Sequence, residues 1–151
     1  KKNELNKIIK DSINLMKTND KDIVINFNTE EVHYVNSDTE QLNRVFINLL
    51  KNSIESLKEK HQKTGDFKKK IDVEIQLIND YISIIVQDNG TGFTNNDLKT
   101  LSKPYFTTKK EGSGLGLSIV EKILNDHNGF IEFISQKEGA KIKILLPKYV
   151  N

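Results

Sequence analysis

The fold is decided by the segment at residues 45–57, which reads VFINLLKNSIESL. In and just before this segment, apolar residues recur three and four positions apart, as one face of an α-helix requires. These residues are Leu42, Val45, Phe46, Leu49, Leu50 and Leu57. Ser37 and Asp38 are the candidate N-cap residues, and a polar loop around residues 61–70, which holds Gly65, is expected to end the helix. The sequence therefore predicts one long helix with a buried face.

Hydrophobic periodicity on both sides of this helix predicts the remaining elements. Further helices are expected at residues 5–16 and 115–126, with a short helical piece at 96–101 and Gly129 as the C-terminal cap of the last helix. Strands are expected at 23–27, 32–35, 71–77, 81–86, 130–135 and 141–146, with turns at Asn79-Asp80 and Glu138-Gly139. This order predicts an α+β fold, a two-layer α/β sandwich in which three main helices lie on one face of a mixed sheet.

Composition excludes several classes of protein. The length of 151 residues suits one domain, expected at residues 1–151, and 23 Lys+Arg against 21 Asp+Glu give a net charge of +2. That charge is too small for nucleic-acid binding by bulk electrostatics, and no apolar run approaches the ~18 residues of a membrane span. Cysteine is absent, so there is no disulfide and no thiol nucleophile. We expect an intracellular protein that is not inserted in a membrane and has no nucleic-acid partner.

Two asparagines flank the apolar face of the long helix. Asn48 and Asn52 are four positions apart, so their side chains lie one above the other. A carboxamide oxygen is a neutral, hard ligand that suits Mg²⁺ when phosphates supply the negative charge. The alternative interpretation is two exposed asparagines in a chain that is rich in asparagine.

A second segment follows directly on the strand expected at 81–86: residues 88–93 read DNGTGF. A carboxylate at the end of a strand, here Asp88, can accept hydrogen bonds from an exocyclic amine such as that of adenine. Gly90 and Gly92 allow positive φ and a close approach of the backbone to a flat ring. The alternative is an ordinary Asp-Asn-Gly turn.

A third segment, GSGLGL at residues 112–117, leads into the last helix. Glycines at such a position allow backbone N–H groups to converge on an anion, and the helix N-terminus adds partial positive charge. The G-x-G-x-G spacing is not the dinucleotide fingerprint, and the Gly-Lys-Ser/Thr ending of a P-loop is missing. Just upstream, residues 104–109 read PYFTTK, which could form a lid that brings Lys109 to a terminal phosphate. The alternative interpretation of the glycine-rich segment at 112–117 is a flexible linker before a helix.

In this order and spacing, the segments resemble the N, G1, F and G2 boxes of the GHKL superfamily of ATP-binding proteins. The resemblance spans residues 11–146 and is greatest to the catalytic and ATP-binding domain of bacterial sensor histidine kinases. VFINLLKNSIESL and PYFTTKKEGSGLGLSIVEKIL, at residues 104–124, are similar to the nitrogen-regulation sensors of the NtrB/NtrY type. The resemblance implies a Bergerat-type ATP-binding fold.

The resemblance also implies a role for individual residues. Asn52 would coordinate Mg²⁺, with Asn48 as a second candidate ligand, and Asp88 would bind the adenine amine. Phe106 matches the lid aromatic, and Lys109 would meet the terminal phosphate. The implied catalytic residues are Asn48, Asn52 and Lys109. The implied ATP-binding residues are Asn52, Asp88, Gly90, Gly92, Phe106, Thr108, Gly112, Gly114, Leu115, Gly116 and Leu117.

The implied activity is transfer of the γ-phosphate of Mg-ATP to a histidine of the kinase's own dimerisation domain, with a response-regulator receiver domain as the later partner. The parent protein would be a homodimer in the cytoplasm, or the cytoplasmic part of a membrane-bound sensor. The isolated chain lacks the histidine box and is expected not to autophosphorylate. His33, His61 and His127 have no following Glu and are expected to be structural or solvated.

Two positions bear on which branch of the superfamily the chain resembles. Asn48 stands where gyrase-like and MutL-like members carry a catalytic Glu, and Asn cannot accept a proton at neutral pH, which favours transfer over hydrolysis. Glu55 stands where many histidine kinases have a Lys. A hydrolytic GHKL ATPase clamp, a serine kinase of the anti-sigma-factor type and a non-catalytic binding module remain as alternatives.

Overall fold

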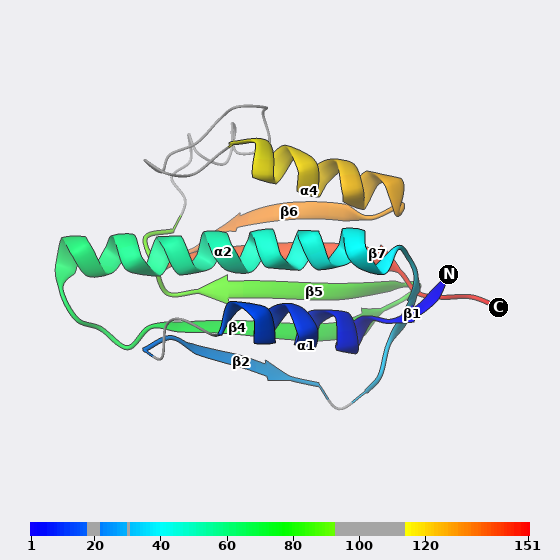
Figure 1. Cartoon of the computed structure of the whole chain (residues 1–151), viewed down its shortest axis with the longest axis horizontal. Coiled ribbons are helices and arrows are strands. Elements are labelled where there is room, and N and C mark those ends of the chain that lie inside the picture. Colours follow the sequence, from blue (N-terminus) through cyan, green and yellow to red (C-terminus); the bar gives the residue numbers. More distant parts are fainter. Residues whose placement is uncertain (18–21, 30, 93–113) are drawn as a thin grey trace.

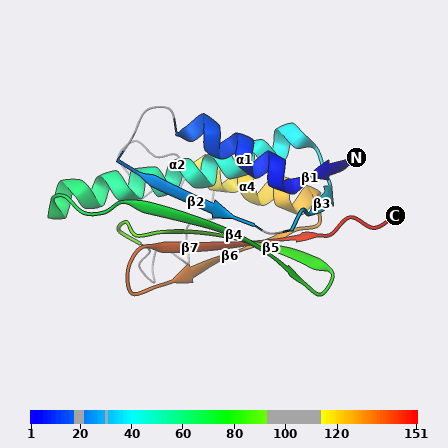
Figure 2. The same cartoon turned by 90° about the horizontal axis from the view of Figure 1, so that it is seen from below.

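The computed structural model describes residues 1–17, 22–29, 31–92 and 114–151. In this part of the chain, three helices cover one face of a five-stranded sheet (Figures 1 and 2). The lid segment at 104–109, Gly112 and the short helical piece expected at 96–101 lie outside the described residues.

The helices are α1 (Leu5–Met16), α2 (Thr39–Thr64) and α4 (Gly114–Asp126). The strands are β1 (Lys2–Glu4), β2 (Val24–Asn28), β3 (Tyr34–Asn36), β4 (Lys70–Ile78), β5 (Tyr81–Asp88), β6 (Phe130–Ser135) and β7 (Ala140–Pro147). The main sheet has the order β2-β4-β5-β7-β6, and β1 pairs with β3 in a separate two-stranded sheet. Only the β2–β4 pair of the main sheet is parallel, and the chain makes that crossover through α2. The predicted α+β sandwich with a mixed sheet is therefore confirmed.

Strict alternation on the central strands builds the core under the helices. Ile82, Ile84 and Val86 of β5 are almost fully buried, and each lies opposite a buried residue of β7 in the sheet register. Alternate side chains of a strand share one face, so these residues form a single apolar layer. α2 lies on this layer between α1 and α4 (Figure 2), and its buried residues include Phe46 and Leu49. The sheet and α2 therefore form the main hydrophobic core of the described residues.

The predicted ends of the long helix are partly right. Asp38 is the N-cap of α2, and its carboxylate accepts a hydrogen bond from the Gln41 backbone N–H at 3.1 Å. The expected loop from residue 61 is wrong, because the helix continues to Thr64 and ends at Gly65. An i,i+4 ion pair between Lys63 and Glu59, with a nitrogen–oxygen distance of 3.1 Å, supports this additional turn.

The end of α4 also differs from the prediction. The Gly129 N–H does bond to the Leu124 carbonyl at 2.7 Å, but the residue with left-handed backbone is Asn128, with φ of 58°. Asparagine tolerates this conformation better than other non-glycine residues. The predicted turn at Asn79-Asp80 is confirmed, since β4 and β5 pair up to both sides of it.

Candidate functional site

Asn48 and Asn52 lie on the flank of α2 that faces α4. The opposite flank packs on α1, where the Ser12 hydroxyl donates to Asn43 Oδ1 at 3.0 Å. Asn52 is nine residues after Asn43, which is about two and a half turns at about 3.6 residues per turn, so it projects from the other side. Asn48 precedes Asn52 by one turn, and both side chains are half-buried. By helix geometry, both carboxamides therefore belong to one row on the flank of α2 opposite α1.

Asp88 is the last residue of β5, and its carboxylate is buried with 4% exposure. Its Oδ1 accepts from the Gly90 backbone N–H at 2.8 Å and from the Ala140 backbone N–H at 3.4 Å. The Ser56 hydroxyl lies 3.5 Å from the same oxygen. Donors from the loop after β5, from β7 and from α2 thus converge on one carboxylate oxygen, and they fix the orientation of Asp88.

Ser56 joins the two predicted ends of the site. It lies on α2 four residues, or about one turn, after Asn52, which is about 6 Å further along the helix axis. Its Oγ accepts from the Thr91 backbone N–H at 2.9 Å and lies 3.1 Å from Thr91 Oγ1. The residue that touches Asp88 is therefore one helical turn from Asn52, so Asn52 and Asp88 lie on the same side of the molecule.

Glycines allow the loop after Asp88 to lie against its neighbours. A Cβ at Gly90 would lie 2.7 Å from the carbonyl carbon of Ser56, so a side chain there would collide with the backbone of α2. Gly139, in the turn between β6 and β7, has φ of 76°, and a Cβ there would lie 2.7 Å from the Asp88 carbonyl carbon. Gly92 packs against the Gly139 carbonyl. The loop is in direct backbone contact on two sides.

Asn89 holds a third side of this loop against the segment at the start of β4. Its Oδ1 accepts from the Lys70 backbone N–H at 2.9 Å, and its Nδ2 donates to the Lys68 carbonyl at 2.7 Å. The Lys60 ammonium donates to the Asn89 carbonyl at 3.0 Å and lies over the Phe67 ring, 4.7 Å from its centroid. Asn89 therefore anchors the loop that follows Asp88 to the start of β4 and, through its carbonyl, to α2.

The remaining described residues of the predicted site belong to α4. Gly114, Leu115 and Gly116 form its first turn, and Leu117 is half-buried against the core. The N-terminus of α4 and the end of β5 lie at the same end of the molecule (Figure 1). A helix N-terminus carries partial positive charge and backbone N–H groups without intrahelical partners, so this turn could contact an anion. Phe106, Thr108, Lys109 and Gly112 lie outside the described residues, and their roles stay predictions.

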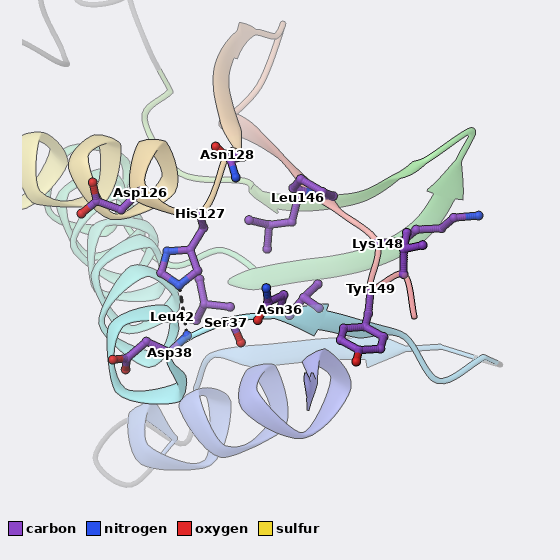
Figure 3. A pocket seen from close by; sticks show the side chains of 13 residues that line it. Asn36, Ser37, Asp38, Leu42, Asp126, His127, Asn128, Leu146, Lys148 and Tyr149 are labelled. Atoms are coloured by element: carbon purple, nitrogen blue, oxygen red, sulfur yellow. Dashed lines mark hydrogen bonds between the residues drawn. The ribbon is translucent and has the colours of Figure 1, made fainter. Parts of the chain in front are cut away.

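A separate cavity of about 470 Å³ lies at the other end of α2, near its N-cap (Figure 3). His127 lines it: Nδ1 is 2.7 Å from the Ile123 carbonyl, and Nε2 accepts from the Asp38 backbone N–H at 3.1 Å. This histidine therefore ties the end of α4 to the start of α2. The residues that line this cavity include none of the predicted ATP-binding or metal-binding residues.

Neither a metal cluster nor a membrane span is found in the described ranges. These residues contain no group of three or more His, Cys, Asp or Glu that could hold a metal ion. A magnesium site built from amide and phosphate oxygens would not require such a group. None of the described helices combines the length and the apolar character that crossing a bilayer requires.

Three contributors to the site were not predicted from the sequence: Ser56, Gly139 and the backbone N–H of Ala140. Ser56 falls in the phase of the buried face of α2, where a hydroxyl gives no distinctive signal. Gly139 was assigned only to a turn. Both meet Asp88 through tertiary contacts, which no local pattern encodes.

The fold and the glycine-rich loop beside Asp88 are consistent with the class of ATP-binding domain expected from the sequence, and a comparison with protein families shows the class. The family described as "Histidine kinase-, DNA gyrase B-, and HSP90-like ATPase" matches residues 37–150. The chain belongs to this family.

Individual relatives are named as kinases. The chain is 36% identical over 146 residues to an NtrY-like sensor histidine kinase of Rickettsia conorii, covering 95% of this chain and 23% of that one. It is 34% identical over 152 residues to sporulation kinase C of Bacillus subtilis, covering 97% of this chain and 34% of that one. The chain thus spans about a quarter to a third of the length of these relatives.

A solved structure supports the same assignment. The nucleotide-free catalytic domain of the histidine kinase ThkA superposes with a TM-score of 0.83 at 29% identity, covering 98% of this chain and 95% of that one. The chain is therefore similar to a histidine kinase catalytic domain over nearly its whole length, and the predicted resemblance to sensor histidine kinases is confirmed.

Proposed function

We propose that this chain is the catalytic domain of a two-component sensor kinase, which binds Mg-ATP and presents the γ-phosphate to a histidine of the kinase's own dimerisation domain. The observation that carries the proposal is the contact between Asp88 and Ser56, a residue of α2 that lies one helical turn from Asn52. The kinase names of the relatives support the reaction class. A receiver domain of a response regulator would then take the phosphoryl group, and the parent would act as a homodimer.

The described residues fit a magnesium nucleotide. Asp88 offers a buried carboxylate that can accept from the amino group of adenine, on a loop whose glycines bring backbone close to α2. Asn52, with Asn48 beside it, offers amide oxygens of the kind that Mg²⁺ accepts. The first turn of α4 offers backbone N–H groups to phosphate oxygens. When bound, Mg²⁺ neutralises phosphate charge.

The chain's own contribution would be positioning, because phosphoryl transfer depends mainly on alignment and electrostatic stabilisation. Asp88 would hold the base at one end, and Asn52 and Asn48 would hold the phosphates at the other. Asn48 is neutral and cannot take a proton from water. The site would therefore retain ATP for an external nucleophile rather than hydrolyse it efficiently.

Nucleotide binding tests the site directly. A fluorescent ATP analogue is titrated into wild type, Asp88→Asn and Asn52→Ala, with and without Mg²⁺. We expect Asp88→Asn to weaken binding severely and Asn52→Ala chiefly to remove the dependence on Mg²⁺. Asn26→Ala is the matched control, because Asn26 lies exposed on β2 and bonds only to Asp72 among the interactions found. Unchanged affinity in both site variants would contradict the assignment.

The reaction is tested by adding a separate dimerisation domain that carries the phosphoacceptor histidine. With [γ-³²P]ATP, we expect acid-labile phosphate on the added domain and none on the isolated chain. Asp88→Asn should abolish the signal. Steady ATP hydrolysis by the chain alone, lost in Asn48→Ala, would instead favour a hydrolytic clamp.

A further inference from the structure

Ser56 is a buried serine whose hydroxyl has three polar neighbours. The residue is 6% exposed, and its Oγ lies 2.9 Å from the Thr91 backbone nitrogen, 3.1 Å from Thr91 Oγ1 and 3.5 Å from Asp88 Oδ1. A serine hydroxyl can donate one hydrogen bond and accept two. The number of neighbours therefore matches its full capacity.

The chemistry of the neighbours fixes the direction of each bond. The Thr91 backbone N–H can only donate to Ser56, and an ionised Asp88 carboxylate can only accept from it. The single Ser56 proton is then used on Asp88, so the Thr91 hydroxyl must donate to Ser56. All three contacts are satisfied in this one arrangement, a hydrogen-bond chain from Thr91 through Ser56 to Asp88.

This chain of bonds sets the polarity of the loop surface. Because the Thr91 hydroxyl donates its one hydrogen bond to Ser56, it can only accept a hydrogen bond from any further group. The Asp88 carboxylate is also an acceptor. A purine with a 6-amino group could donate to such a surface, whereas a 6-oxo group would place acceptor against acceptor, which is costly in a desolvated site.

We propose that Ser56 is a positioning residue that holds Asp88 and Thr91 as hydrogen-bond acceptors and thereby gives the site its preference for adenine over guanine nucleotides. The inference rests on the nucleotide site proposed above and adds a determinant of its base specificity. Ser56 acts through Asp88 and Thr91 and need not touch the nucleotide.

Ser56→Ala removes the hydroxyl without adding bulk near Gly90. We expect ATP binding to weaken by about tenfold, the size expected when one structural hydrogen bond to a charged group is lost. GTP binding should change little, so the selectivity ratio, which is the Kd for GTP divided by the Kd for ATP, should fall by about tenfold. A general loss of structure would weaken both nucleotides alike.

Ser12→Ala is the matched control. Ser12 is a fully buried serine on α1, with its hydroxyl 2.9 Å from the Ile8 carbonyl and 3.0 Å from Asn43 Oδ1. Loss of the Ser12 hydroxyl should lower thermal stability by about as much as loss of the Ser56 hydroxyl, and it should leave the selectivity ratio at the wild-type value.

Thr91 provides a second test that does not depend on the folding of Ser56→Ala. Thr91→Val keeps the shape and removes the hydroxyl, so the ratio should fall, whereas Thr91→Ser keeps the hydroxyl and should retain it. In the double variant Ser56→Ala/Thr91→Val, the loss should not exceed that of Ser56→Ala alone, because both changes break the same chain of bonds.

The outcomes separate this inference from the proposed function. If wild type binds ATP through Asp88 and the Ser56→Ala and Thr91→Val variants keep the wild-type ratio, the inference is overturned and the nucleotide site stands. If wild type binds no ATP, the site and the inference both fail. A reduced ratio in Thr91→Val alongside a retained ratio in Thr91→Ser supports the inference.

Discussion

Gly90→Ala should weaken ATP binding because the new methyl group has no room against α2. A Cβ at this position would lie 2.7 Å from the Ser56 carbonyl carbon and 2.9 Å from the Ser56 carbonyl oxygen. Carbon atoms in contact normally stay at least about 3.5 Å apart, so the loop must retreat by about 0.8 Å. Helix backbone cannot yield as a side chain would, so the displacement falls on the loop.

That displacement would weaken the hydrogen bond that the Gly90 N–H donates to the Asp88 carboxylate. The Gly90 N–H makes the shortest of the hydrogen bonds found at Asp88 Oδ1, at 2.8 Å. A retreat of this size would lengthen the bond to about 3.6 Å if it were directed along it, beyond hydrogen-bond range. Overpacking of this kind costs about 1–3 kcal/mol of stability. We expect ATP affinity to fall by about tenfold to a hundredfold.

Binding of a fluorescent ATP analogue and thermal unfolding are measured together, with Gly65→Ala as the control. Gly65 has φ of 87° and ψ of −164°, with nothing within 4 Å of a built Cβ, so alanine there strains the backbone by roughly 1–3 kcal/mol without a collision. Both variants should lose stability, but only Gly90→Ala should lose ATP affinity. Wild-type affinity in Gly90→Ala would refute the close approach of the loop to α2.

Two further substitutions test the frame of the site. Asp38→Ala removes the N-cap of α2, so the free energy of unfolding measured by chemical denaturation should fall by about 1 kcal/mol while ATP affinity is kept. An unchanged denaturation midpoint would show that the cap contributes nothing. Lys60→Met keeps the apolar stem but removes the ammonium from the Asn89 carbonyl and the Phe67 ring. The free energy of unfolding should therefore fall by about 1 kcal/mol. A variant as stable as wild type would contradict a contribution from these contacts.

Local patterns were sufficient to predict most elements and the order of the candidate site segments. The helix at 5–16 has the bounds of α1, because its apolar residues recur at helical spacing and become buried. Asp38 was predicted as an N-cap because its short side chain can reach a free N–H in the first turn. The Asn79-Asp80 turn was predicted because Asn adopts positive φ readily.

Features that depend on tertiary contact were not predicted. β1 is a three-residue polar strand that exists through its pairing with β3, as in the pair Lys2 and Asn36, and has no periodicity of its own. The expected strand at 32–35 therefore joined a small separate sheet rather than the main one. Ser56 and Gly139 are 32 and 51 residues from Asp88 in sequence, so their contact with it follows only from the packing of α2 and β7 on β5.

The central claim is that Asn48, Asn52 and the loop after Asp88 bind one magnesium nucleotide. The most direct test is an NMR titration of the ¹⁵N-labelled chain with ATP, first with Mg²⁺ and then with paramagnetic Mn²⁺ in its place. We predict that Mg-ATP shifts the amide signals of Gly90 and Thr91, and that Mn²⁺ then broadens the side-chain amide signals of Asn48 and Asn52. The signal of the Asn26 side chain should stay sharp. If the Asn48 and Asn52 signals are not broadened, or if the signals of the loop after Asp88 do not shift, one magnesium nucleotide does not contact both the asparagines of α2 and this loop.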